Sequence, residues 1–173
     1  MTASERIPLP LGALGALGAT LLLLATGLLT ACAATPLRPL PAINQRLEQN
    51  GSSRDPSLSG RWLALVSGRD GRERVELIDL ELNRPVPLPG LNRPDAQTLN
   101  VSVDASGERI ALIRQRDGRT ELALYSRSRQ SLQPLPLDPP GVPRQLQLAA
   151  DGRVLAVQVS RGGLWQVDLI ELP

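Results

Sequence analysis

The chain has 173 residues, a formal net charge of +2, one cysteine and no histidine, and its 19 basic residues are all arginine. Without histidine it lacks the usual general base near neutral pH and the commonest zinc ligand, which excludes Ser-His-Asp and Cys-His catalysis. The small charge and the scarcity of aromatic residues give no basis for nucleic-acid binding. We therefore expect a non-enzymatic protein with no catalytic residue, no metal or cofactor site and no small-molecule substrate.

Residues 1–31 have the order of a secretory signal peptide. A short polar start that carries Arg6 precedes the apolar run Leu9–Leu29, and small residues then lead to the only cysteine. The segment Leu29–Cys32 reads Leu-Thr-Ala-Cys and resembles the lipobox of bacterial lipoproteins. This resemblance implies that the signal peptide is removed and that the sulfur of Cys32 carries a diacylglycerol.

A lipidated Cys32 would anchor the mature protein to a membrane of the bacterial cell envelope, because two acyl chains bind a bilayer stably. The residue after the cysteine is Ala33, and not the aspartate that commonly retains lipoproteins in the inner membrane. We therefore expect the periplasmic side of the outer membrane. The alternative is an uncleaved transmembrane helix, since the 19 residues of Leu11–Leu29 approach the length of about 20 that spans a bilayer.

Residues 32–57 have the composition of a tether. Prolines punctuate the first part, and Asn, Gly, Ser and Asp dominate the end. A short helical turn is expected around Ile43–Leu47, and the rest shows no strand pattern. A domain is expected over residues 58–173.

An internal repeat lies behind the tether. Ser59–Pro89 aligns without a gap on Ser106–Pro136 at an offset of 47, and 12 of the 31 positions are identical. A third copy begins at Gly152 at an offset of 45. Each copy has a turn with glycine, a nearly continuous apolar run, a second glycine turn and a return strand, which is typical of antiparallel strands.

The repeat predicts up to four short strands in each copy. The first strands are Thr98–Val103 and Gln145–Leu148; the second are Trp62–Val66, Arg109–Ile113 and Val154–Val157; the third are Val75–Leu80, Leu122–Tyr125 and Trp165–Leu172. The Pro-Leu-Pro segments at 87–89 and 134–136 are expected in edge strands, because proline cannot donate to a ladder. The first copy lacks a good inner strand, since residues 49–56 are polar, and the third stops at Pro173 before an outer strand.

A four-stranded repeat of about 45 residues has the period of a β-propeller blade. Val103–Leu112, followed by Arg116-Asp117-Gly118, resembles the repeat of TolB-type propellers, although Ala-Ser-Gly stands where that family has Ser-Pro-Asp-Gly. The fold class expected is all-β, a partial propeller of about three four-stranded antiparallel blades behind a signal helix and tether. The family's propeller closes with six blades, so this chain has two unfinished ends.

Two further patterns have more than one interpretation. Arg-Asp-Gly at 69–71 and 116–118 is a hairpin turn rather than an adhesion motif. Six arginines lie close in sequence and could bind an anionic partner, although charges at strand ends commonly protect sheet edges. They are Arg109, Arg114, Arg116, Arg119, Arg127 and Arg129, near Asp117 and Glu121.

The function expected is a membrane-anchored envelope lipoprotein whose propeller repeats form a non-catalytic, protein-binding scaffold. The alternatives are a structural lipoprotein that links the membrane to the cell wall and an accessory subunit of an envelope enzyme. The uncovered ends would expose apolar surface unless a protein partner or a second copy of the chain completes the propeller. A monomer that curls into a compact sandwich or open barrel is the competing possibility.

Overall fold

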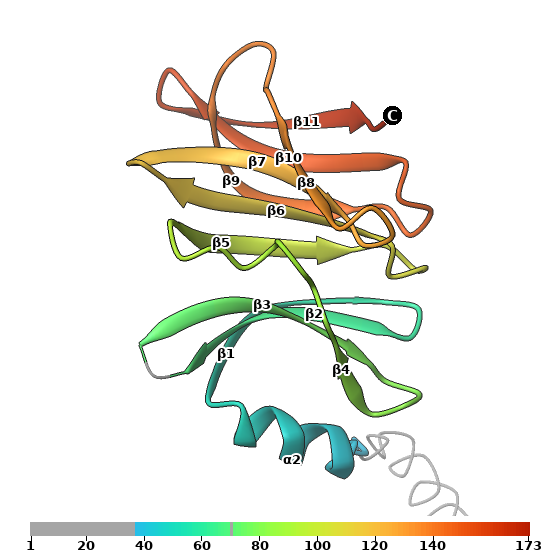
Figure 1. Cartoon of the computed structure of the whole chain (residues 1–173). Coiled ribbons are helices and arrows are strands. Elements are labelled where there is room, and N and C mark those ends of the chain that lie inside the picture. Colours follow the sequence, from blue (N-terminus) through green and yellow to red (C-terminus); the bar gives the residue numbers. More distant parts are fainter. Residues whose placement is uncertain (1–36, 70) are drawn as a thin grey trace, which may run out of the picture. The chain divides into compact units, whose positions relative to one another are not determined.

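Three small antiparallel sheets and one short helix make up the part of the chain that the computed structural model describes, residues 37–69 and 71–173 (Figure 1). All of them belong to one compact unit, Leu40–Pro173. Each sheet is formed by a consecutive part of the chain, which we call blades one, two and three. The all-β partial propeller expected from the sequence is confirmed.

Each blade is a meander in which neighbouring strands in the sequence pair. Blade one contains β1 (Ser52–Ser59), β2 (Trp62–Arg69), β3 (Arg72–Asp79) and β4 (Arg84–Val86). Blade two contains β5 (Ala96–Val103), β6 (Arg109–Arg116), β7 (Arg119–Ser126) and β8 (Ser131–Leu135). Blade three contains β9 (Val142–Leu148), β10 (Val154–Arg161) and β11 (Leu164–Glu171), without a fourth strand among the described residues.

The strands begin and end where the sequence has turn residues. Asp117 and Gly118 join β6 to β7 with φ of +51° and +72°, which confirms that Arg116-Asp117-Gly118 is a hairpin turn. Pro134 lies in β8, which is an edge strand, as expected. The first Pro-Leu-Pro segment was expected in a strand too, but β4 ends at Val86, before Pro87.

The expectation that blade one lacks an inner strand is wrong, because β1 occupies Ser52–Ser59 and pairs with β2. Its polar side chains do not prevent the strand, since several of them bond to blade two. Arg54 donates from Nη2 to the carbonyl oxygen of Thr98 at 2.7 Å, and Ser57 Oγ accepts from the backbone N–H of Val103 at 3.1 Å. Most of β1 therefore lies within residues 32–57, in the stretch that its composition indicated as a tether.

The helix α2 (Pro41–Gln49) precedes β1 and confirms the helical turn expected around Ile43–Leu47. Ile43, Arg46 and Leu47 are its half-buried residues. Arg46 Nε donates to Asn83 Oδ1 at 3.0 Å, and Asn50, just after the helix, donates from Nδ2 to Glu76 Oε2 at 2.7 Å. These contacts attach the helix to blade one.

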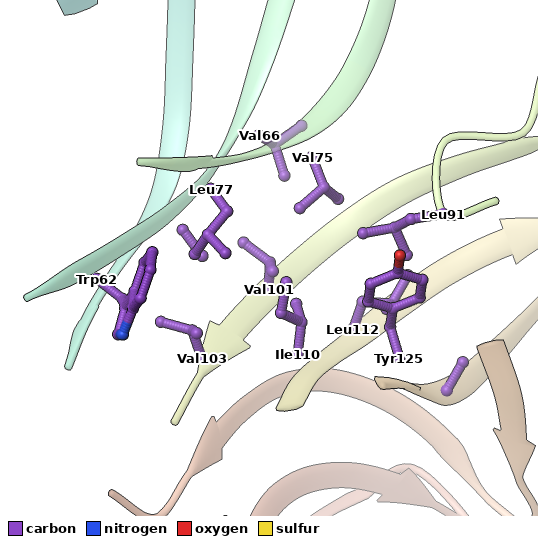
Figure 2. Close-up of a cluster of buried hydrophobic side chains, with 12 residues drawn as sticks. Trp62, Val66, Val75, Leu77, Leu91, Val101, Val103, Ile110, Leu112 and Tyr125 are labelled. Carbon is purple, nitrogen blue, oxygen red and sulfur yellow. The ribbon is translucent and has the colours of Figure 1, made fainter. Parts of the chain in front are cut away.

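The blades are held together by two apolar cores. The first lies between blades one and two, where Val66 and Leu77 face Val101 and Ile110 (Figure 2). The second lies between blades two and three and includes Ile113, Leu122, Leu155 and Val157. Blade two thus contributes to both cores, as the nearly continuous apolar run of β6 indicated.

Candidate binding surface

The first strands of neighbouring blades, β1, β5 and β9, are connected by side chains. Ser102 Oγ accepts from the backbone N–H of Leu148 at 2.9 Å, just as Ser57 does from Val103. Asn100 Oδ1 accepts from the backbone N–H of Leu146 at 3.0 Å. A polar residue on one inner strand therefore satisfies an N–H of the next inner strand, which the sheet itself leaves unpaired.

A second contact between blades involves a glycine turn. Gly107, with φ of +66°, lies so close to Trp62 that a Cβ there would be 2.5 Å from the indole ring. Trp62 is 5% exposed, and the guanidinium carbons of Arg61 and Arg127 each lie 4.8 Å from its ring centroid. At the next interface, Arg109 Nη1 donates to the carbonyl oxygen of Gly152 at 3.0 Å. The start of each second strand thus contacts the turn of the following blade.

The outer face of blade three has no such covering among the described residues. β11 lies at the end of the stack of sheets away from α2 (Figure 1), and Trp165, Val167 and Leu169 alternate along it at 55%, 69% and 75% exposure. Val142 and Val154 on the neighbouring strands are also exposed and lie on the same face. We call these five residues the open face. Contiguous exposed apolar residues of this kind mark interaction sites more often than scattered ones do.

Polar groups also lie on the open side of blade three, next to the apolar residues of β11. Gln145, Gln147 and Gln158 line a shallow groove of about 150 Å3 that also contacts Val167. The guanidinium carbon of Arg144 lies 5.9 Å from the centroid of the Trp165 ring. The apolar side chains of β11 thus lie beside amide and arginine groups, and such a mixture of apolar and polar groups occurs in protein–protein interfaces.

On the opposite face of β11, the charge of Asp168 is neutralised by an arginine of the same blade. Arg161 donates to both carboxylate oxygens of Asp168, at 2.9 Å from Nη1 and 2.5 Å from Nη2. This hydrogen-bonded guanidinium lowers the pKa of Asp168 below its ordinary value, although partial burial acts in the opposite direction. The pair faces blade two and is therefore structural.

The six arginines that lie close in sequence do not form one patch. Since β6 runs from Arg109 to Arg116, they divide between the two ends of blade two, about 23 Å apart. Arg114 is 4% exposed and donates from Nε to Glu121 Oε1 at 2.6 Å. The six arginines therefore do not form a common surface that could bind an anionic partner.

The site predicted at Cys32 lies outside the described residues. Within residues 37–69 and 71–173, no helix is long and apolar enough to cross a membrane, and no three acidic, histidine or cysteine residues are grouped to hold a metal ion. The repeat predicts an uncovered end, but it does not by itself identify Trp165, Val167 and Leu169 as the surface of that end. Their alternation in the third return strand was the signal that could have identified them.

The sequence matches no protein-family model and no curated protein. Among solved structures, TolB from Acinetobacter baumannii superposes with a TM-score of 0.53 and 18% identity, over 68% of this chain and 29% of the TolB chain. The β-propeller domain of the Trilobed protease from Pyrococcus furiosus gives 0.46 and 16%, over 70% of this chain and 42% of that one.

A prolyl endopeptidase gives a TM-score of 0.40 and 10% identity, over 77% of this chain and 29% of its own. The chain therefore spans less than half of each of these proteins, and the likeness concerns the fold alone. The first of these superpositions agrees with the repeat and with the three meander sheets. The described domain is a three-blade segment of a β-propeller that resembles TolB.

Proposed function

We propose that this protein is a lipid-anchored lipoprotein of the bacterial envelope that acts as a non-catalytic, protein-binding scaffold. The open face of blade three is the observation that carries the proposal, because Val167 and Leu169 are more than two-thirds exposed on a regular strand. Leaving them in water forgoes about 1.5–3 kcal/mol of burial for each side chain. A protein partner that covers them recovers this free energy.

The anchor is supported by the sequence. An apolar run that ends in Leu-Thr-Ala-Cys resembles a signal peptide followed by a lipobox, and Cys32 is the only cysteine of the chain. Two acyl chains would keep the domain on the periplasmic side of its membrane, where the tether sets its reach. Palmitate labelling should mark the protein, and Cys32→Ser should abolish the label and leave the precursor unprocessed. Label that survives this substitution would contradict the anchor.

The non-catalytic role is supported by the chemistry that the chain lacks. There is no histidine or lysine, and the only thiol is the predicted lipidation site. An enzyme would need an unusual serine–carboxylate or all-carboxylate site. Turnover of an ester, peptide or glycan by the purified protein, lost on a single substitution of a polar residue, would overturn this part of the proposal.

The binding surface can be tested with a photo-crosslinking side chain placed at position 167 or at position 164. Val167 and Leu164 are 69% and 66% exposed on the same strand but face opposite sides of β11, so they form a matched pair. A discrete protein adduct in intact cells from position 167, and none from 164, supports the scaffold. Equal labelling from both positions would contradict a specific binding surface on this face. Adducts with cell-wall material alone would contradict the scaffold and favour the structural link to the cell wall.

A further inference from the structure

The ladder pairing gives each blade equivalent positions. Ala64, Ala111 and Ala156 pair with Leu77, Leu124 and Leu169 in blades one, two and three. Leu77 and Leu124 are 0% and 7% exposed because the next blade covers them, whereas Leu169 is 75% exposed.

A second set of equivalent positions shows the same difference in exposure between blade three and the other two blades. Val66, Ile113 and Gln158 pair with Val75, Leu122 and Val167, which are 2%, 1% and 69% exposed. At Val167 and Leu169 the open face therefore carries apolar residues equivalent to those that receive the following blade at both internal interfaces, while Gln158 stands on β10 where the other blades have Val66 and Ile113.

The polar contacts of the interfaces are repeated as well. Ser57, Ser102 and Gln147 are equivalent, since they pair with Ala64, Ala111 and Ala156. The two serines each accept a backbone N–H from the next inner strand. The amide oxygen of Gln147, which is exposed, is placed to accept from an incoming strand in the same way.

The other half of this interface is present at the opposite end of the chain. Leu58, Val103 and Leu148 occupy equivalent positions on the inner strands, because they pair with Leu63, Ile110 and Leu155. Val103 and Leu148 are 1% and 5% exposed in the two cores, but Leu58 is 67% exposed. Blade one thus has the face that elsewhere packs against a preceding blade, but Leu65 and Ile78 on that face are 2% and 0% exposed, so it is largely covered in this structure.

That face has one acidic residue, Glu76, where blade two has Ala123. The equivalent residue in blade three, Asp168, lies at the interface with blade two and is neutralised by Arg161. Glu76 likewise has a partner within blade one, since Ser67 Oγ donates to its Oε1 at 2.7 Å. A carboxylate at this position is therefore compatible with packing between blades.

From these equivalences we propose that the partner of the open face is a second copy of this chain. Blade three of each copy packs on blade one of the other and repeats the internal interface. This inference rests on the proposed function and names its partner. The contact is head-to-tail, and a two-fold arrangement closes it into a ring of six blades, within the 4–8 that propellers use.

In the proposed dimer, the helix α2 would compete with the second copy for blade one. It lies on the face of blade one that the second copy needs, as shown by the hydrogen bond from Asn50 to Glu76, which points away from the first core. None of its residues is fully buried, and the hydrogen bonds of Arg46 and Asn50 attach it to blade one. It moves aside when the second copy docks, and in the monomer it acts as a removable cap.

The test is the oligomeric state of the full-length protein in detergent, measured by native mass spectrometry at micromolar concentration. We expect a dimer, and we expect Leu169→Asp and Leu58→Asp each to be monomeric. Leu164→Asp is the matched control, because Leu164 is 66% exposed on the other face of β11, and it should remain dimeric. All three residues are exposed, so the circular dichroism and melting temperature of each variant should match those of the parent.

Mixing the two monomeric variants tests the head-to-tail arrangement. Each homodimer would contain two damaged interfaces, whereas a mixed dimer contains one intact interface, so the mixture should form a heterodimer. Dimers that tolerate Leu58→Asp, or a mixture that stays monomeric, would overturn the arrangement. Arg46→Ala with Asn50→Ala should release α2 and strengthen the dimer at least about tenfold; an unchanged or weaker dimer would contradict the cap.

The experiments distinguish failure of the proposed second copy from failure of the proposed scaffold function. A parent protein that remains monomeric while position 167 crosslinks a different protein would reject the second copy and retain the scaffold. A monomer with no adduct from position 167 would reject both.

Discussion

Gly107 and Trp62 make a close approach between blades one and two. The glycine adopts a φ of +66° in the turn before β6, and the indole ring fills the space that a side chain would take. Both features require glycine, one through the backbone and the other through packing. Gly118 allows the backbone effect to be measured without the packing effect, because it has a φ of +72° but no atom within 4 Å of the position that a Cβ would take.

Gly107→Ala is therefore expected to destabilise the domain more than Gly118→Ala. The left-handed backbone alone should cost about 1 kcal/mol in both variants. The clash with Trp62 should add about 2 kcal/mol in the first. Urea unfolding followed by tryptophan fluorescence measures both free energies. Equal losses would show that the indole moves aside freely.

The ion pair of Arg161 and Asp168 should give the stability a specific pH dependence. Because hydrogen bonding to Arg161 lowers the pKa of Asp168 in the folded protein, the stabilisation is complete above the unfolded pKa and is lost as the pH falls through the folded pKa. Asp168→Asn should thus be less stable than the parent at pH 7, and the difference should shrink below about pH 4.

Urea midpoints measured between pH 3 and pH 7 test this expectation. Asp117→Asn is the control, because the Asp117 side chain is 84% exposed and its ion pair with Arg116, at 3.6 Å, lies in solvent, where such pairs contribute little; its curve should run parallel to that of the parent. A difference at position 168 that is constant with pH would mean that the carboxylate charge contributes nothing.

At the scale of the element, β1 shows a strand that its own sequence does not indicate. The apolar runs of β2, β6 and β10 could be predicted because burial on both faces leaves a local pattern. Ser52–Ser59 leaves none, since its partners Val103 and Thr98 are more than 40 residues away. β1 pairs with β2 of its own blade, and several of its polar side chains are satisfied by blade two.

The candidate surface, like the strands, could be predicted only in part from the sequence. Counting the repeats indicated an unfinished end, but the gapless offset of 47 does not hold for the inner strands, where Ser57 corresponds to Ser102. The turn after β5 is longer than the turn after β1 and shifts the register by two residues. Only the ladder pairs show that Val167 and Leu169 correspond to buried residues of the other blades.

Ser102→Ala should show how much the inner strands depend on side-chain hydrogen bonds. Ser102 is 3% exposed, and its loss leaves the N–H of Leu148 without the acceptor that it has in the folded domain. An orphaned buried donor costs about 1–3 kcal/mol. Ser53→Ala, on the exposed start of β1, should change the stability by less than about 0.5 kcal/mol. Similar values for the two variants in urea unfolding would contradict this account of the strand.

For the whole molecule, the two cores predict a gradient of local stability. Blade two is covered on both faces, and Ile110–Arg114 in β6 is an unbroken buried run. β11 is at an edge, with one face open, and α2 has no fully buried residue. Segments with few buried contacts open locally at low free energy, whereas the most covered segments open only with the whole domain.

Native-state hydrogen exchange measured by mass spectrometry should therefore rank the peptides of this domain. Amides of β6 should exchange slowest, with the free energy of global unfolding, and those of α2 and β11 fastest. In the dimer proposed above, β11 becomes covered while α2 is released, so raising the protein concentration should protect β11 and deprotect α2. Leu169→Asp should remove this dependence and Leu164→Asp should retain it. Protection that is uniform across the blades would mean that the domain opens only as a unit, and that the exposed end has no separate dynamics for a partner to use.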